Sequence, residues 1–113
     1  ELGELSNLEF LWLNTNQLSG TPPQELSQLT KLRYLYLSGN AALEGGLPDK
    51  ILDLTQLEGV YVHFTNMTGT IPCELVKLAN FKNLEAHNTS IDGCIEINCL
   101  RTECGLEPLQ VSP

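Results

Sequence analysis

The sequence has no long apolar run and few basic side chains, and each absence excludes a class of partner. No stretch of about 18 apolar residues occurs, so no direct membrane insertion is expected of this segment. Lys and Arg number 6 against 14 Asp and Glu, which gives a formal net charge of −8. Because phosphate backbones and anionic membrane surfaces would repel such a chain, we expect no nucleic-acid partner.

Signatures of catalysis and cofactor binding are also absent. The sequence contains no Gly-rich phosphate loop, dinucleotide fingerprint or zinc-binding helix motif, so we expect no cofactor. His87, Ser90 and Asp92 lie close together, but at a predicted strand exit and the turn after it, with no evident oxyanion site or lid. We therefore expect no catalytic residues and predict that the chain is not an enzyme.

Cysteines are few, and all of them lie in the last third of the chain. They are Cys73, Cys94, Cys99 and Cys104. An even number clustered at one end indicates two disulfides and an oxidising compartment. A zinc site is the alternative, but the spacing lacks a Cys-x-x-Cys pair, and we expect no metal there. Two candidate glycosylation sequons, at Asn66 and Asn88, also favour an extracellular or cell-surface location.

What the chain does have is a repeat of 24 or 25 residues. The apolar columns and the polar residue that ends each copy are Leu2, Leu5, Leu8, Leu11, Leu13, Asn16; Leu26, Leu29, Leu32, Leu35, Leu37, Asn40; Ile51, Leu54, Leu57, Val60, Val62, Thr65; and Leu75, Leu78, Phe81, Leu84, Ala86, Thr89. A stretch similar to Leu-x-Gly-x-Ile-Pro follows each copy. This periodicity predicts about four stacked repeats, at residues 2–25, 26–50, 51–74 and 75–98.

Each column of the repeat has a physical reason. Leu-x-Leu alternates inward and outward, as in a short strand, and equivalent strands stack into a parallel sheet. The Asn that follows can bond to the backbone of the turn and of the neighbouring coil, whereas Thr65 and Thr89 are expected to give a looser turn. The spacing Leu-x-x-Leu-x-x-Leu suits a short 3₁₀ or irregular segment on the outer side.

The pattern resembles the plant-type leucine-rich repeat, with the consensus LxxLxxLxLxxNxLxGxIPxx, over about residues 1–98. The resemblance implies an α/β solenoid, a right-handed superhelix with a short parallel sheet on its concave face and 3₁₀ or irregular segments on its convex face. The family includes the extracellular domains of receptor-like kinases and receptor-like proteins, and polygalacturonase inhibitors. It implies non-catalytic recognition of a protein, peptide or glycan by the concave sheet, with a co-receptor as a further partner.

The two ends differ from a complete family member. No signal peptide or cysteine-bearing cap precedes the first repeat, so we expect a fragment of a longer receptor-like or secreted protein. Residues 99–108 are predicted to form a cysteine-stapled cap and residues 109–113 a tail. Three disulfide connectivities are open, and the preferred one pairs Cys73 with Cys94 and Cys99 with Cys104.

The outward positions of the predicted strands hold six of the seven aromatic residues. With their polar neighbours they form the predicted ligand-binding set: Phe10, Trp12, Asn14, Tyr34, Tyr36, Tyr61, His63, Phe64, Glu85 and His87. Trp and Tyr dominate binding hot spots, which favours a binding face. The alternative is that cross-strand stacking of these rings only stabilises the sheet. His63 and His87 share a column and could bind a metal or sense pH, but plain surface polarity is preferred.

A second column has a structural explanation. Glu9, Arg33, Glu58 and Lys82 alternate in sign, which predicts a ladder of cross-strand ion pairs. For function, the alternative to a recognition domain is a structural or interaction array, in a cell wall, in self-association or on ice. Regular outward Asn or Thr columns would favour ice binding, and the columns here are irregular.

Overall fold

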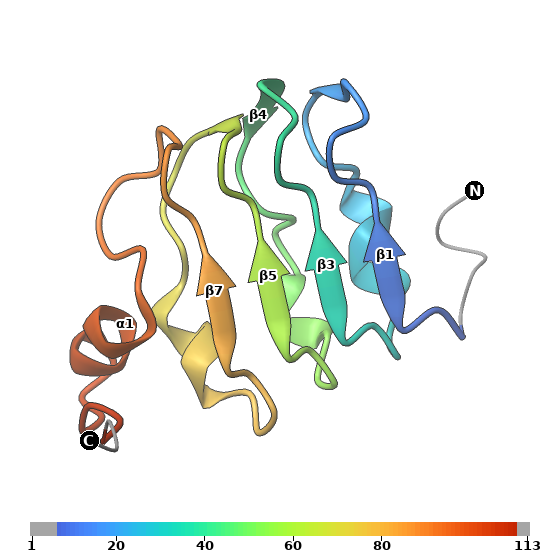
Figure 1. Ribbon diagram of the computed structural model, residues 1–113. Helices are drawn as coiled ribbons and strands as arrows, with labels where there is room; N and C mark the ends of the chain where they lie inside the picture. The colour runs from blue at the N-terminus through green and yellow to red at the C-terminus, as the bar shows by residue number, and fades with distance from the viewer. Residues whose placement is uncertain (1–6, 111–113) are drawn as a thin grey trace.

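The computed structural model describes residues 7–110, which form a short solenoid. Four strands lie side by side in Figure 1, with helical turns behind them and α1 at the C-terminal end. The elements are β1 (Phe10–Trp12), β2 (Ser19–Gly20), η2 (Gln24–Gln28), β3 (Tyr34–Tyr36), β4 (Ala42–Gly45), η3 (Ile51–Asp53), β5 (Gly59–Tyr61), β6 (Asn66–Met67), η4 (Cys73–Lys77), β7 (Asn83–Glu85) and α1 (Ile97–Glu103). Leu2 and Leu5 of the first predicted repeat lie outside the described residues.

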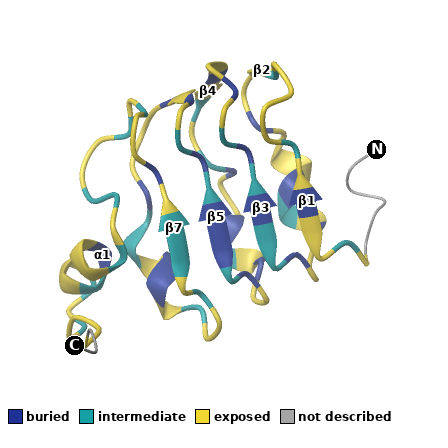
Figure 2. Ribbon diagram, in the orientation of Figure 1, coloured by how far each residue is buried: buried dark blue, intermediate teal, exposed yellow. Residues whose placement is uncertain are grey.

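The main sheet is parallel and has the order β1-β3-β5-β7. Its register pairs Leu11 with Leu35, Leu35 with Val60, and Val60 with Leu84, so equivalent repeat positions are neighbours. Leu11, Leu35 and Val60 are buried, and Figure 2 shows this burial on β1, β3 and β5. Because one coil cannot bury its own apolar column, each coil depends on the coils beside it. The predicted solenoid with a parallel sheet is confirmed.

The segments opposite the sheet are 3₁₀ helices, as the spacing of three predicted. Pro23 and Pro72 immediately precede η2 and η4, with φ angles of −67° and −65°. Proline suits this place because its fixed φ fits the helix start and its missing N–H would have had no helical partner. The turns bury Leu26, Ile51 and Leu75 against the inner side of the sheet.

Two elements were not predicted from the sequence. A second parallel sheet has the order β2-β4-β6, and its strands are two to four residues long, too short to show an alternation of apolar residues. Helix α1 begins at Ile97, two residues before the predicted start of the cap at 99, and it buries Leu100. It packs against η4 and covers the end of the core.

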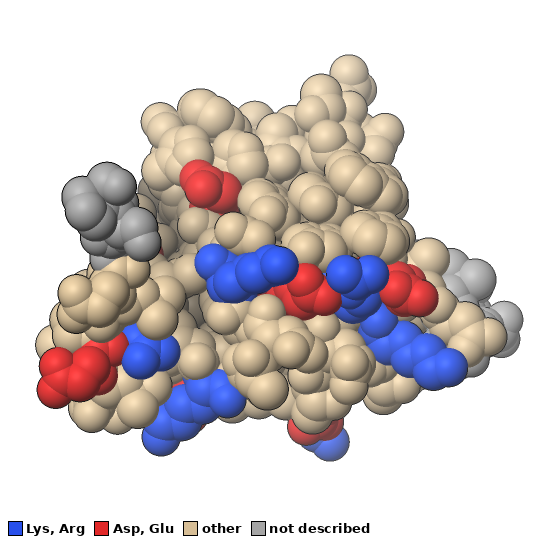
Figure 3. Space-filling view, turned by 60° about the horizontal axis from the view of Figure 1, so that its bottom comes forward, with Lys and Arg blue, Asp and Glu red and all other residues tan. Residues whose placement is uncertain are grey.

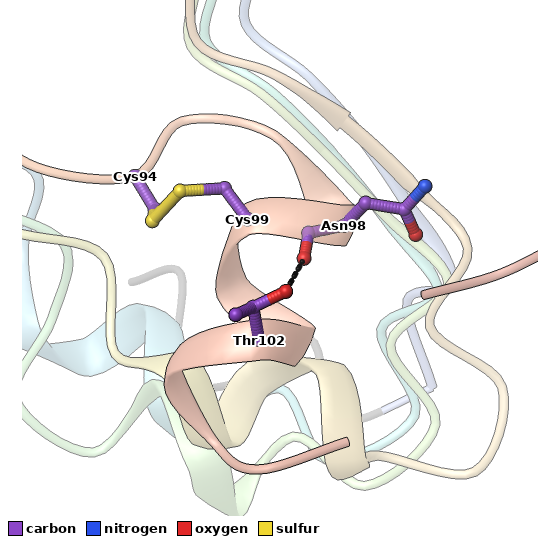
Figure 4. Close-up of a disulfide and its surroundings, with 4 residues drawn as sticks. All are labelled: Cys94, Asn98, Cys99 and Thr102. Carbon is purple, nitrogen blue, oxygen red and sulfur yellow. Dashed lines mark hydrogen bonds between the residues drawn. A yellow bond between two sulfur atoms is a disulfide. The ribbon is translucent and has the colours of Figure 1, made fainter. Parts of the chain in front are cut away.

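The preferred disulfide pairing was wrong. The structure pairs Cys73 with Cys104, with Cα atoms 5.6 Å apart, and Cys94 with Cys99, with Cα atoms 5.5 Å apart. The reason is α1, which packs on η4 and thereby brings its C-terminal Cys104 to Cys73 at the start of η4. Figure 4 shows Cys94 on the segment entering α1 and Cys99 on the helix. In the helix itself the Thr102 hydroxyl donates to the Asn98 carbonyl oxygen at 3.0 Å.

The polar residue that follows each strand was predicted to bond to the backbone of its turn, and Asn40 does so. The Asn40 side chain is fully buried and bonds to two coils. Its Oδ1 accepts the N–H groups of Asn16 and Leu18 at 3.0 and 2.9 Å, and its Nδ2 donates to the carbonyls of Leu13 and Leu37 at 3.0 and 2.8 Å. All four partners are backbone groups that would otherwise have no partner in a buried turn.

The Thr residues at the same repeat position bond only within their own coils. Thr65 Oγ1 donates to the Val62 carbonyl at 2.7 Å, and Thr89 Oγ1 donates to the Ala86 carbonyl at 2.8 Å. Each hydroxyl also accepts the backbone N–H two residues later, at 3.4 and 3.2 Å. A single hydroxyl therefore closes the turn but does not link it to the preceding coil, and the looser turn expected at Thr65 and Thr89 stays a prediction.

Candidate functional site

Five outward rings of the main sheet stack into one group, here called the aromatic stripe: Phe10, Trp12, Tyr34, Tyr36 and Tyr61. The sheet register places ring beside ring on neighbouring strands. Ring centroids are 5.2 Å apart for Phe10 and Tyr34, and 3.9 Å apart for Trp12 and Tyr36. Tyr36 and Tyr61 follow at 4.7 Å, with ring planes 9° apart. Because neighbouring rings cover both faces of Tyr36, which lies between Trp12 and Tyr61, this part of the stripe presents mainly ring edges and hydroxyls to solvent.

Exposure differs along the stripe. Trp12 is 60% exposed and Phe10 is 39% exposed, whereas the three tyrosines are half-buried. Burial, with lesser contributions from Tyr36, Tyr34 and Glu85, raises the pKa of Tyr61 above its ordinary value. The Tyr61 hydroxyl is therefore neutral at physiological pH and keeps its donor proton. The stripe combines exposed apolar edges with hydroxyl donors, which is the composition of many recognition surfaces.

Gly59 provides the space in which two of these rings lie. A Cβ at this position would come within 2.9 Å of Tyr61 Cε2 and 3.0 Å of Tyr34 Cδ1. Gly59 is the register partner of Tyr34, so the Tyr34 ring lies where a side chain on β5 would otherwise stand. The absence of a side chain at one outward position thus allows the rings on either side to approach each other.

The predicted ion-pair ladder is present beside the stripe, and a row of alternating blue and red crosses the face shown in Figure 3. Arg33 contacts Glu9 at 3.2 Å and Glu58 at 2.6 Å, and Lys82 contacts Glu58 at 3.4 Å. The Glu58 side chain is only 14% exposed. Its hydrogen bond from Arg33, followed by that from Tyr34, lowers the Glu58 pKa from 4.5 to about 2.

The ladder and the stripe are joined by contacts that the sequence analysis missed. The Tyr34 hydroxyl donates to Glu58 Oε1 at 2.9 Å. The Arg33 guanidinium lies over the rings of Phe10 and Tyr34, with its carbon 5.4 and 5.6 Å from their centroids, within the range of cation–π attraction. The only sequence signal for these contacts was that Arg33 and Tyr34 are adjacent. The two columns therefore act as one surface.

The remaining aromatic site residues form a separate group, the histidine–phenylalanine cluster of His63, Phe64 and His87. The two imidazole rings are stacked with centroids 4.8 Å apart, and the Phe64 ring meets them edge-on at 5.6 and 5.2 Å. His87 Nδ1 lies 3.3 Å from Glu85 Oε1, whereas His63 Nδ1 is buried with no hydrogen-bond partner among the described residues. One predicted surface is therefore built from two differently organised parts.

One column beside these residues has a left-handed backbone, which the sequence analysis did not predict. Thr15, Gly39, Phe64 and Asn88 have φ angles of 56°, 75°, 56° and 54°. Gly39 and Asn88 were the sequence signals, since glycine adopts this conformation freely and asparagine tolerates it. Thr15 and Phe64 carry the strain, which concentrates at functional sites, and Phe64 is also 53% exposed. Asn14, the predicted site residue before Thr15, is exposed and outside both ring groups.

The two candidate glycosylation sites are both exposed. Asn66 lies in β6, and its Oδ1 accepts the Ser90 hydroxyl at 3.2 Å, so the two sequons touch each other on adjacent coils. Asn88 lies next to His87, at the edge of the histidine–phenylalanine cluster. Modification of both residues stays a prediction.

Among residues 7–110, no helix is long and apolar enough to cross a membrane. In the same part of the chain, the group of side chains close enough to share a metal ion consists of Cys73, Glu74 and Cys104, and its two sulfurs form a disulfide. Thiolates are the sulfur ligands of metals, so the oxidised pair does not offer them.

Comparisons with known proteins agree with this geometry. Residues 6–59 match the family model described as Leucine Rich repeats (2 copies). Receptor-like protein 41 of Arabidopsis thaliana is 39% identical over 72 residues, which cover 63% of this chain and 8% of that protein. The chain thus spans less than a tenth of the curated relative.

Two solved structures show the range of proteins with this fold. One is the ectodomain of the Arabidopsis receptor kinase HAESA in complex with an N-terminally extended IDA peptide hormone ligand, with a TM-score of 0.78 and 32% identity, covering 89% of this chain and 17% of that one. The other is a plant ice-binding protein, with a TM-score of 0.72 and 33% identity, covering 84% of this chain and 31% of that one.

Proposed function

Because this chain is an extracellular leucine-rich repeat array of the plant receptor-like family, we propose that it recognises an extended peptide or protein segment through its concave sheet. Its two disulfides fit an extracellular or cell-surface location, where such bonds persist. Leucine-rich repeat ectodomains are typically non-catalytic, and recognition rather than catalysis is the role proposed here. A co-receptor is the proposed second partner of the whole protein.

The aromatic stripe is the observation that carries this proposal. Its rings lie on adjacent strands, are partly exposed, and are held in place by stacking and by the Arg33–Glu58 ladder. A surface ordered in advance loses little side-chain entropy when a ligand binds. Trp12, Tyr36 and Tyr61 follow one another in register along the solenoid, so a ligand lying across the strands contacts them in turn.

The way the rings stack favours a peptide over a glycan. Sugars bind aromatic side chains by lying on open ring faces, and the faces within the stripe are covered by neighbouring rings. Ring edges and the tyrosine hydroxyls remain, and these suit peptide carbonyls and apolar side chains. The HAESA ectodomain, a structural neighbour, is itself in complex with a peptide hormone.

A structural array is the second candidate, and the likeness to a plant ice-binding protein is the observation that favours it. Ice binding needs regular, flat columns of small polar groups. Here the central outward column reads Trp12, Tyr36, Tyr61 and Glu85, which is bulky and irregular. We therefore rank it below peptide recognition, and an ice-recrystallisation assay on the wild-type protein distinguishes the two.

The test replaces Trp12, Tyr36 and Tyr61 together by Ala. Peptides are first selected on the wild-type protein from a displayed random library, and a glycan array is probed in parallel. Since hot-spot side chains each contribute about 2 kcal/mol, we expect the selected peptides to bind the triple variant at least about a hundredfold more weakly. A matched variant, Gln28→Ala with Lys50→Ala, changes exposed residues on and next to the convex 3₁₀ helices and should bind as the wild type does.

Circular dichroism and urea unfolding establish that each variant is folded. Undiminished peptide binding by a folded triple variant would refute the proposed role of the stripe. Selection of glycans instead of peptides would refute the ligand class.

A further inference from the structure

The stripe leads directly to a hollow at the edge of the sheet. In the register, Tyr61 is paired with Glu85, so Glu85 continues the column of Trp12, Tyr36 and Tyr61. Next to Glu85 is a hollow of about 230 Å³, lined by Leu84, Glu85, Ala86, His87, Ile95 and Glu96. It lies between the last strand, β7, and the segment that enters α1.

Acidic side chains dominate the hollow, and among the described residues the one basic side chain that lines it is His87, whose Nδ1 lies 3.3 Å from Glu85 Oε1. It contains the carboxylates of Glu85 and Glu96, and no Lys or Arg lines it in the described part of the chain. Lys82 is engaged by Glu58, and Arg101 donates to the carbonyl of Glu107. Glu96 is the residue before α1, yet its side chain makes no capping hydrogen bond, so no hydrogen bond from the helix start occupies its carboxylate.

A backbone acceptor at the same place is also unused. β7 is an edge strand of the described sheet, and the chain around it bonds to the preceding coil through alternate residues: the Asn83 N–H donates to Glu58, and the carbonyls of Glu85 and His87 accept from Val62 and Phe64. The carbonyl of the intervening Leu84 faces the outer edge, because alternate residues of a strand bond to opposite sides. Among residues 7–110 no backbone hydrogen bond from outside the strand ladder reaches this carbonyl. An unpaired acceptor beside two carboxylates suits a donor with several N–H groups.

From these observations, which rest on the proposed peptide recognition, we propose that the hollow binds a Lys or Arg side chain of the ligand. At roughly 30 Å³ per water molecule, the space would otherwise hold several waters, and it accommodates one long side chain. Arg offers five N–H donors in a planar fork and Lys offers three, enough to bond to Glu85, Glu96 and Leu84 together. The net charge of −8 also steers a basic ligand toward this protein.

The geometry gives the position of the basic residue in the ligand. Strands lie about 4.8 Å apart, so the three steps from Trp12 to Glu85 cover about 14 Å. An extended peptide advances about 3.3 Å per residue, so the basic residue should stand about four residues from the one that contacts Trp12. The inferred motif is an apolar or aromatic anchor and a Lys or Arg at that separation.

The test repeats the peptide selection on a variant with Glu85→Gln and Glu96→Gln, which keeps the shape and removes both charges. Peptides selected on the wild type should be enriched in Lys or Arg at one position, and the enrichment should vanish on this variant while the apolar anchor is retained. The matched control carries Glu25→Gln and Glu74→Gln, two exposed acids on the 3₁₀ helices, and changes the net charge equally. It should retain the enrichment.

One selected peptide then gives the size of the effect. Replacing its basic residue by citrulline, a neutral analogue of Arg, should weaken binding to the wild type by about ten- to a hundredfold. The same replacement should change binding to the Gln variant by less than about threefold, because that variant no longer has the two carboxylates that the basic residue would contact.

The possible failures are distinguishable. Selected peptides that need the aromatic stripe but show no basic preference, or keep it on the Gln variant, overturn this inference and leave the proposed function intact. Basic peptides that need Glu85 and Glu96 but not the stripe support the hollow and overturn the role of the stripe. The absence of any stripe-dependent or charge-dependent peptide overturns both.

Discussion

The two halves of the solenoid hold their coils together by different means. In the N-terminal half, the buried amide of Asn40 bonds to the backbone of its own coil and of the preceding one. In the C-terminal half, Thr65 and Thr89 bond only within their own coils, and two disulfides hold the last coil and α1 instead. The amide of Asn40 has enough donors and acceptors to serve both coils, whereas the hydroxyls of Thr65 and Thr89 make their donated and accepted bonds within their own turns. The disulfides therefore lie in the half of the solenoid where side-chain hydrogen bonds from the turns do not link neighbouring coils.

The same division runs through the concave face. The rings of the aromatic stripe are engaged with one another and with the ion-pair ladder. In the described part of the C-terminal half, by contrast, His63 Nδ1 is buried without a hydrogen-bond partner and the Glu96 side chain makes no capping hydrogen bond. For the proposed peptide recognition, we expect the stacked rings to contribute binding energy and these polar groups to contribute selectivity.

The largest effect should come from the disulfides. Replacing Cys73 and Cys104 by Ser opens a loop with a sequence separation of 31, which should lower the free energy of unfolding by about 3.5 kcal/mol on loop entropy. Replacing Cys94 and Cys99 opens a separation of 5 and should cost about 2 kcal/mol. Urea unfolding of the two double variants measures the two losses of stability and shows which one is larger.

Hydrogen exchange locates the effect of the first pair. The amides of α1 should lose protection while those of β1 and β3 keep it, because α1 packs on η4 and not on the first coils. Equal loss of protection along the whole chain would contradict the independence of the two halves.

The turn of Asn40 provides the next test. Asn40→Ala leaves four partly or fully buried backbone groups without their partner and should destabilise the protein by about 2–3 kcal/mol. Thr65→Ala removes one hydroxyl from the equivalent turn and should cost about 1 kcal/mol. Thermal or urea unfolding of the pair compares the two turns directly. Equal losses would mean that the inter-coil bonds of Asn40 add no stability.

A smaller effect is expected at Gly59. Gly59→Ala places a methyl group against the rings of Tyr34 and Tyr61, and overpacking of this kind should cost about 1–2 kcal/mol. Near-ultraviolet circular dichroism should change as the rings move. Gly46→Ala is the matched control, since its Cβ would meet nothing closer than the Thr68 carbonyl at 3.7 Å. A dichroism spectrum unchanged by Gly59→Ala would show that the rings do not depend on this space.

The last effect concerns pH. The Glu58 pKa is lowered from 4.5 to about 2 in the folded chain, so the unfolded chain takes up the proton first as the pH falls. The stability that Glu58 contributes is therefore complete above about pH 4.5 and is lost as the pH falls toward 2. Urea unfolding of Glu58→Gln and wild type should differ at pH 7 and converge near pH 2. Exposed Glu25→Gln should show no such convergence, and a constant difference for Glu58→Gln would contradict the ladder.

Local patterns in the sequence predicted most of the fold. The Leu-x-Leu and Leu-x-x-Leu patterns indicate which faces of the strands and 3₁₀ turns are buried. The repeat period aligns equivalent residues of neighbouring coils, and this alignment predicted the sheet, the aromatic columns and the charge ladder. The pairing of Cys73 with Cys104 did not follow from these patterns, because it depends on how α1 packs on η4. The left-handed backbone of Phe64 did not, because only Gly39 and Asn88 marked that column and neither type resembles Phe.

The division of the site into two groups was also hidden from the sequence. The repeat alignment places Tyr61 and His63 two residues apart on the same predicted strand. It does not predict the side-chain orientations that decide which ring each of them stacks on. In the structure Tyr61 stacks on Tyr36, while His63 stacks on His87. These choices depend on three-dimensional packing, including the space above Gly59.

The stacking of Trp12 on Tyr36 has a spectroscopic consequence. Trp12 is the sole tryptophan of the chain, and its ring lies 3.9 Å from Tyr36, with Tyr61 next in the series. Light absorbed by these tyrosines therefore passes to the indole, and emission from the folded protein comes mainly from one residue of the first strand. When a ligand covers that residue, or when the first coil opens, the emission shifts. The protein thus carries its own optical reporter for the surface through which it is proposed to bind.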